Sequence, residues 1–163
     1  MNKKLFILIF VAVAIAGYLG YSILTSNKNQ ETIAVKLYYY NPALDKDAAG
    51  NIMCGRNGLA AVRRDIPKNK MPIQDTIRLL LKGELTAEEH AQGIGTEYPL
   101  EGFSLKEAFL KDGILTLEFE DSKNKTVGGS CRVGILWFQI EATAKQFPEA
   151  REVRFLPEEI FQP

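Results

Sequence analysis

An uncharged hydrophobic segment near the N-terminus constrains this chain more than any other feature. Residues 5–24 carry no charge and directly follow a basic start that contains Lys3 and Lys4. A helix of that length covers about 30 Å, which matches the hydrocarbon thickness of a bilayer. We therefore expect residues 1–25 to form one transmembrane anchor. Because the two lysines should stay on the cytoplasmic side, the C-terminal portion should lie outside the cytoplasm.

A cleaved signal peptide is the alternative for this segment. Ala14, Ile15 and Ala16 precede Gly17 and fit the A-x-A pattern of a processing site. The hydrophobic run continues past that site to Leu24, which is longer than a typical signal-peptide core of about 7–15 residues. This length favours the uncleaved anchor. No cysteine lies near the end of the run, so a lipid anchor is not expected, and both alternatives place the domain outside the cytoplasm.

The rest of the chain has the size of one domain. A polar linker at residues 26–32 precedes residues 33–160, and roughly 130 residues suffice for a single compact domain with a real core. Without Lys3 and Lys4, 18 basic residues face 20 acidic ones, a formal charge of −2. No dense Lys/Arg cluster provides the electrostatic footprint of nucleic-acid binding, so we expect no nucleic-acid partner.

The two cysteines, Cys54 and Cys131, both lie outside the hydrophobic segment in glycine-containing, turn-like sequence. In an oxidising compartment they should form a disulfide. Two free thiols are the alternative. Two thiolates and the single His90 do not supply four ligands, and the chain has no C-x-x-C spacing, so neither a metal site nor a cofactor is expected.

Periodicity predicts the elements of the first half of the domain. Residues 33–40 and 59–66 are typical of strands and could pair antiparallel. Pro72 begins a helix, and Gly83 follows as its C-terminal stop. Its apolar stripe should face the core and consists of Ile73, Ile77, Leu80 and Leu81.

The second half contains clearer turn signals. Thr86 is expected to cap a helix of one to two turns, and Asp112-Gly113 should close a tight hairpin between residues 105–110 and 114–119. A second long helix is predicted over residues 131–146, with Ser130 as its N-cap, followed by a last strand at residues 152–156. The predicted stripe of this helix consists of Val133, Leu136, Trp137, Ile140, Ala144 and Phe147.

The resulting order is β-β-α-β-β-α-β after the transmembrane helix. A mainly antiparallel sheet with two helices on one face would bury both helical stripes. The sequence therefore predicts an α+β domain.

Four segments in this order resemble the GerMN domain, the sporulation and spore germination module. They are VKLYYY, LLLKGELTAEEHAQGIGTEYP, FLKDGILTLEFE and GGSCRVGILWFQIEATAKQFPEAREVRFL, and the match covers about residues 35–156 in a single copy. The resemblance implies a non-enzymatic module of the bacterial cell envelope, usually held at the membrane. It further implies assembly or partner binding, and it brings no set of catalytic residues.

The residues themselves offer weak candidates for catalysis. His90 lies in a polar turn without a nucleophile elbow, so it is not expected to act as a hydrolase base. Glu118, Glu120 and Asp121 suggest the paired carboxylates of a glycosidase. However, alternation along a strand puts Glu118 and Glu120 on one face, which we expect to be solvated. We therefore predict no enzyme and no catalytic residue.

The best surface candidates are aromatic. Because consecutive strand residues alternate faces, Tyr38 and Tyr40 could form a binding surface while Tyr39 packs inward. The alternative is that both cover helix ends or loops. The favoured function is a membrane-anchored envelope domain that binds a protein partner or forms a homo-oligomer. The alternative is an accessory domain that binds or remodels peptidoglycan.

Overall fold

The computed structural model describes the fold of Ile15 and residues 31–162. Apart from Ile15, the predicted transmembrane anchor lies outside these residues, as does nearly all of the predicted linker. Among the residues described, no helix is both long and apolar enough to cross a membrane.

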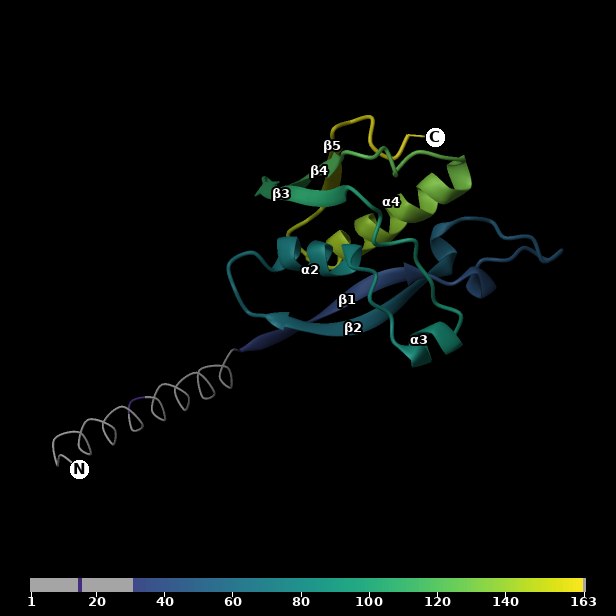
Figure 1. Ribbon diagram of the computed structural model, residues 1–163, viewed down its shortest axis with the longest axis horizontal. Helices are drawn as coiled ribbons and strands as arrows, with labels where there is room; N and C mark the ends of the chain where they lie inside the picture. Colours follow the sequence, from purple (N-terminus) through teal and green to yellow (C-terminus); the bar gives the residue numbers. More distant parts are fainter. Residues whose placement is uncertain (1–14, 16–30, 163) are drawn as a thin grey trace, which may run out of the picture. The chain divides into compact units, whose positions relative to one another are not determined.

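The described strands form two small sheets (Figure 1). The first sheet contains β1 (Thr32–Tyr40) and β2 (Leu59–Pro67), which run in opposite directions. The second contains β3 (Phe103–Lys111), β4 (Ile114–Asp121) and β5 (Glu152–Leu156), in the order β3-β4-β5. β3 pairs with β4 antiparallel, whereas β5 pairs with β4 parallel.

The two longer helices lie between the sheets (Figure 1). α2 (Pro72–Leu81) contacts both β2 and β3, and α4 (Ser130–Lys145) contacts β5. α4 also lies against β1, because the backbone N–H of Tyr38 donates to Thr143 Oγ1 at 3.0 Å. A short third helix, α3 (Ala87–Ala91), follows α2.

The α+β class is confirmed, but the predicted arrangement of sheet and helices is wrong. The strands form two sheets, and α2 and α4 separate these sheets instead of covering one face. β5 is parallel to β4 because α4 carries the chain back along the sheet before β5 begins. A strand, crossover helix and strand in this order give parallel pairing.

The predicted helical stripes form the core. In α2 the four predicted apolar residues are all buried, with Ile77 and Leu80 fully enclosed. In α4, Trp137 is only partly buried, as is Phe147 beyond the end of the helix, while two polar residues of α4, Gln139 and Thr143, are completely buried. Rings from β3, β4, β5 and the C-terminal segment extend the core in contact with one another, namely Phe103, Phe119, Phe155 and Phe161.

The local turn signals are mostly confirmed. Asp112 and Gly113 have φ angles of 53° and 82°, as the tight β3–β4 hairpin requires. Thr86 caps α3, and Gly83 adopts a φ of 64° after α2. The predicted cap of α4 is wrong, because Gly129 is the N-cap and makes no side-chain capping bond.

Candidate functional site

The segment between β1 and β2 extends from the first sheet as an arm, which we define as residues 41–58 (Figure 1). It contains the short turns η1 (Pro42–Leu44) and η2 (Arg56–Gly58). Lys46 and Ile52 form an antiparallel bridge, and Asp47 Oδ1 accepts a hydrogen bond from the backbone N–H of Asn51 at 2.8 Å. The outer part of the arm is therefore a small, internally bonded hairpin.

A buried carboxylate fixes the base of the arm. Asp45 is 3% exposed, and its Oδ2 accepts hydrogen bonds from the Tyr40 hydroxyl at 2.7 Å and from the Gly55 N–H at 2.5 Å. Burial, together with this carboxylate, raises the pKa of Tyr40 to about 12. The Tyr40 ring lies so close to Gly58 that a Cβ there would be 2.3 Å from Tyr40 Cε2.

Tyr40 is therefore covered by the arm, with only 7% of the residue exposed, as in the alternative that the sequence left open. Tyr38 is half-buried, and its backbone is bonded to Thr143 of α4. A binding role for Tyr38 stays a prediction.

The arm is also tied covalently to α4. Cys54 and Cys131 form the predicted disulfide, with their Cα atoms 5.2 Å apart. Two residues further on, Arg56 forms an ion pair with Glu141, and its guanidinium lies 4.1 Å from the centroid of the Phe138 ring. The first turn of α4, through Cys131, and its second half, through Phe138 and Glu141, therefore help to hold the second half of the arm.

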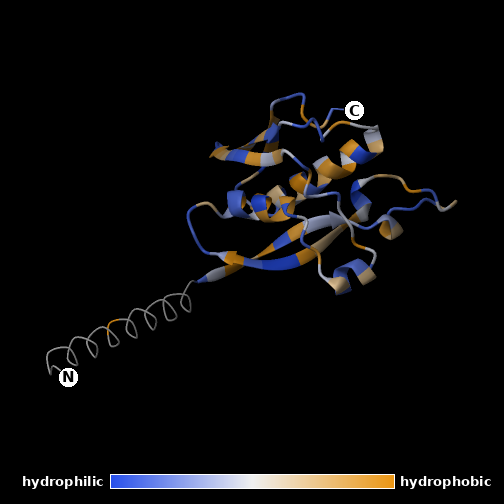
Figure 2. Cartoon of the chain, in the orientation of Figure 1, coloured by the Kyte–Doolittle hydropathy of each residue, from blue (hydrophilic) through white to orange (hydrophobic). Residues whose placement is uncertain are grey.

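Although the arm is held firmly, it exposes large apolar side chains. Leu44 is 58% exposed, Ile52 is 49% exposed and Met53 is 60% exposed. Figure 2 shows hydrophobic segments along the arm at the rim of the domain. Contacts that fix a backbone while leaving apolar side chains in water are typical of binding surfaces rather than of a flexible connection.

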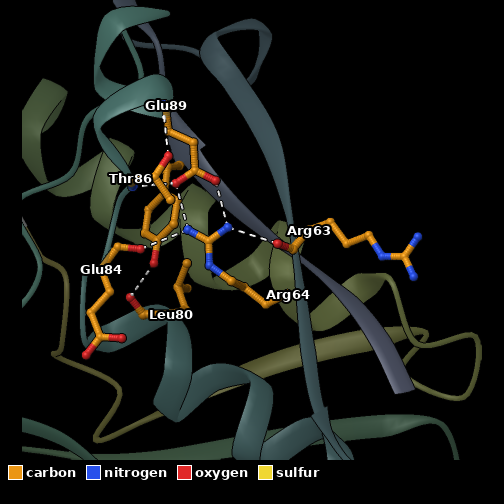
Figure 3. A network of polar contacts seen from close by, with 7 residues as sticks. Arg63, Arg64, Leu80, Glu84, Thr86 and Glu89 are labelled. Atoms are coloured by element: carbon orange, nitrogen blue, oxygen red, sulfur yellow. Dashed lines mark hydrogen bonds and ion pairs between the residues drawn. The ribbon is translucent and has the colours of Figure 1, made fainter. Parts of the chain in front are cut away.

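A second ordered site joins β2 to α3 (Figure 3). Arg64 donates from Nη1 and Nη2 to the two carboxylate oxygens of Glu89, and from Nη2 to the carbonyl of Glu84 at 2.9 Å. Glu89 Oε2 also accepts the N–H of Thr86 at 2.8 Å, which completes a capping box. Tyr39 donates its hydroxyl to the carbonyl of Leu80 at 3.2 Å. Both carboxylate oxygens of Glu89 are bonded within this cluster, so its role is structural.

The candidate catalytic residues lie in separate places. His90 is exposed on α3, and among residues 31–162 no hydrogen bond involves its ring. Glu118 pairs with Lys106 at 3.4 Å on the face of the second sheet that is turned away from the helices. Asp121 is committed to the following loop, where its carboxylate accepts hydrogen bonds from Lys125 and Thr126 at 2.8 Å.

The described residues contain no cluster of three or more His, Cys, Asp or Glu side chains able to hold a metal ion. The sequence patterns did not reveal that Arg64 pairs with Glu89 or that Asp45 is buried. Thr86 and Glu89 have the sequence spacing of a capping box. This spacing does not indicate that Glu89 also pairs with Arg64 on β2.

Comparison with known proteins agrees with this fold. The profile of the Germane family, described as sporulation and spore germination, matches residues 36–159. The structure of the tandem GerMN domains of the sporulation protein GerM from Bacillus subtilis is 21% identical with a TM-score of 0.53. A protein described as a lipoprotein from Clostridium perfringens is 17% identical over 80% of both chains, with a TM-score of 0.39. No protein with a curated description matches the chain.

The GerM structure and the family profile match this chain over different extents. The GerM alignment covers 78% of this chain but only 40% of the tandem structure, so the chain spans less than half of that protein. The family profile accounts for one copy of the domain, running from β1 past β5. This chain belongs to the Germane family of sporulation and spore germination domains.

Proposed function

We propose that this chain is a single-pass membrane protein whose extracytoplasmic Germane domain binds a protein partner or assembles in the bacterial cell envelope, without chemistry of its own. The observation that carries the proposal is the arm, which presents Leu44, Ile52 and Met53 to solvent on a fixed backbone. The Germane family is not a known enzymatic family, which supports a binding role.

The construction of the arm favours binding because contacts within the domain already order its backbone. The disulfide, the Asp45 carboxylate and the Arg56 ion pair fix the arm before any partner arrives. Binding to a preorganised surface loses less conformational entropy than ordering a loose loop would. Methionine is also enriched in protein interfaces, because its side chain adapts to irregular surfaces.

The compartment is inferred from two features. Disulfides persist in oxidising environments outside the cytoplasm, which fits the bond between Cys54 and Cys131. The uncharged run at residues 5–24 supplies an anchor of sufficient length. Mass spectrometry of the mature protein without reduction would report both its N-terminus and the state of the two cysteines.

Photo-crosslinking in native membranes tests the binding function. A photoreactive residue at Met53 should give a discrete adduct, while the same residue at exposed Lys123 on the β4–α4 loop should not. Replacing Leu44 and Ile52 by Ser in the Met53-labelled chain should abolish the adduct. Equal labelling from both positions, or no adduct at either, would contradict the proposal. Retention on purified cell wall that stays the same when Leu44, Ile52 and Met53 are all replaced by Ser would instead favour peptidoglycan binding.

A further inference from the structure

The outer edges of the two sheets differ in how their backbone groups are covered. At the edge of β1, the side-chain amide of Gln146 imitates a neighbouring strand. Its Oε1 accepts the N–H of Lys36 at 2.7 Å, and its Nε2 donates to the carbonyl of the same residue at 2.6 Å. Thr143 accepts the next available N–H of that edge, from Tyr38. α4 therefore occupies this edge.

The edges of β2 and β3 are also interrupted. Beside β2, Arg64 Nη1 donates to the carbonyl of Arg63 at 2.9 Å, and its ion pair with Glu89 holds α3 alongside (Figure 3). In β3 the register shifts between Leu105 and Glu107, and a bulge of this kind disrupts further pairing. Such devices are how proteins protect sheet edges from additional strands.

The edge of β5 has none of these protections. Its register with β4 is regular over all five residues, from Glu152 opposite Ile114 to Leu156 opposite Glu118. Within the described part of the chain, the backbone of residues 153–156 forms hydrogen bonds only with β4. One side of β5 therefore presents unpaired N–H and C=O groups.

A groove of about 400 Å³ follows this bare edge. It is lined by residues from both faces of β5, with Phe155 and Arg154 among them, and by Trp137 of α4 and Ile160 of the C-terminal segment. Leu156, which also lines the groove, is 38% exposed. Because residues of both faces line one groove, the groove lies along the strand edge, where an added strand would lie.

Acidic side chains outnumber basic ones on the C-terminal segment that forms part of the groove. Residues 152–162 contain Glu152, Glu158 and Glu159 but only one cation, Arg154, which is already paired with Glu152 at 2.6 Å. Glu158 lines the groove and is exposed. An incoming segment that carries lysine or arginine would be attracted by these acidic side chains, whereas an acidic segment would be repelled.

We propose that the free edge of β5 receives an extended basic segment of a partner protein, which adds to the second sheet as a fourth strand. This inference rests on the proposed function and names the chemical class of the partner. Strand addition at a bare edge takes its affinity from main-chain hydrogen bonds and its selectivity from neighbouring side chains. Here the selectivity comes from Glu158 and from the apolar side chains that line the groove.

Fluorescence anisotropy with the purified full-length chain in detergent tests this proposal. The probe is a labelled seven-residue peptide of alternating lysine and valine, and the comparison peptide replaces each lysine by glutamate. The lysine peptide should bind at least about tenfold more tightly. A lysine peptide N-methylated at every residue cannot donate main-chain hydrogen bonds and should not bind. Hydrogen exchange should show that the lysine peptide slows exchange at those amides of residues 153–156 that face away from β4.

A charge-reversal pair makes the test specific. Glu158→Lys at the groove should weaken binding of the lysine peptide by about tenfold, while Glu107→Lys, an identical change at an exposed residue of β3, should leave it unchanged. Both variants should unfold at the same temperature as the parent chain. Equal binding of the N-methylated peptide, absence of lysine-peptide binding, or protection elsewhere would overturn the proposal. Protection of residues 153–156 that rises with protein concentration alone would overturn it in favour of a second copy of the chain.

The experiment separates this inference from the broader function. A Met53 adduct that persists without peptide binding at β5 would refute only the strand-edge proposal. Peptide binding at β5 without any Met53 adduct would refute the role of the arm instead.

Discussion

Arg64 on β2 and Glu89 on α3 form a two-point ion pair, in which Nη1 and Nη2 of the guanidinium bond to separate carboxylate oxygens at 2.6 and 2.7 Å. The same carboxylate accepts the N–H of Thr86 and so closes the helix cap. One glutamate therefore both starts α3 and fastens it to the first sheet. Because α3 has only five residues, it depends on such contacts rather than on its own helical stability.

We predict that Glu89→Gln destabilises the domain by about 1–2 kcal/mol, because charge-assisted hydrogen bonds to a half-buried partner are lost. Urea unfolding of the full-length chain would measure the change. Glu88→Gln is the matched control, since Glu88 is the exposed neighbour and forms no ion pair with Arg64. Equal destabilisation by the two variants would contradict the structural role of the pair.

The same pair predicts a loss of stability in acid. The hydrogen bonds from Arg64 hold the pKa of Glu89 below its ordinary value of 4.5. The unfolded chain therefore binds this proton more readily, and the stabilisation that is present above about pH 4.5 disappears as the pH falls through the lower folded pKa. Thermal unfolding between pH 7 and 3 should show a smaller decline for Glu89→Gln than for the parent chain. Parallel curves would refute this prediction.

The disulfide should contribute a large part of the stability. It joins residues 77 positions apart. Closing a loop of that length reduces the entropy of the unfolded chain, which raises its free energy by about 4 kcal/mol at room temperature in the simplest treatment. The double substitution of Cys54 and Cys131 by Ser should lower the unfolding midpoint by a corresponding amount. A reductant should produce the same shift in the parent chain and none in the double variant. A midpoint that the reductant leaves unchanged in the parent chain would show that the bond does not form.

The close approach of Tyr40 to Gly58 makes a steric prediction. Gly58→Ala would place a methyl group 2.3 Å from the Tyr40 ring, so the base of the arm must shift at a cost of about 1–3 kcal/mol. Gly95→Ala is the control, because its added Cβ would meet no heavy atom within 4 Å. Chemical unfolding of both variants would measure the difference. Comparable effects would mean that the Tyr40 ring moves aside freely.

The structure and the sequence-based expectations agree best where the signal is local. The Asp112-Gly113 turn, the Thr86 cap and the stripe of α2 each depend on residues within one or two turns of the chain. These patterns reflect backbone conformation and helical periodicity, which neighbouring residues decide. The predicted Ser130 cap is wrong because Gly129, the residue before it, is the N-cap. Both residue types can precede a helix, so the local sequence does not distinguish between them.

Tertiary structure decided the arrangement that no local pattern encodes. The burial of Tyr40 depends on Asp45 and Gly58, which the arm brings back to the strand. The division into two sheets depends on α4, whose Gln146 amide occupies the edge of β1, and the parallel pairing of β5 follows from the return path of α4. The sequence by itself determined the hydrophobic leader, the individual elements and the class of the domain, because these depend on composition and short-range periodicity. Only long-range packing decided which strand edges are covered and which one is bare.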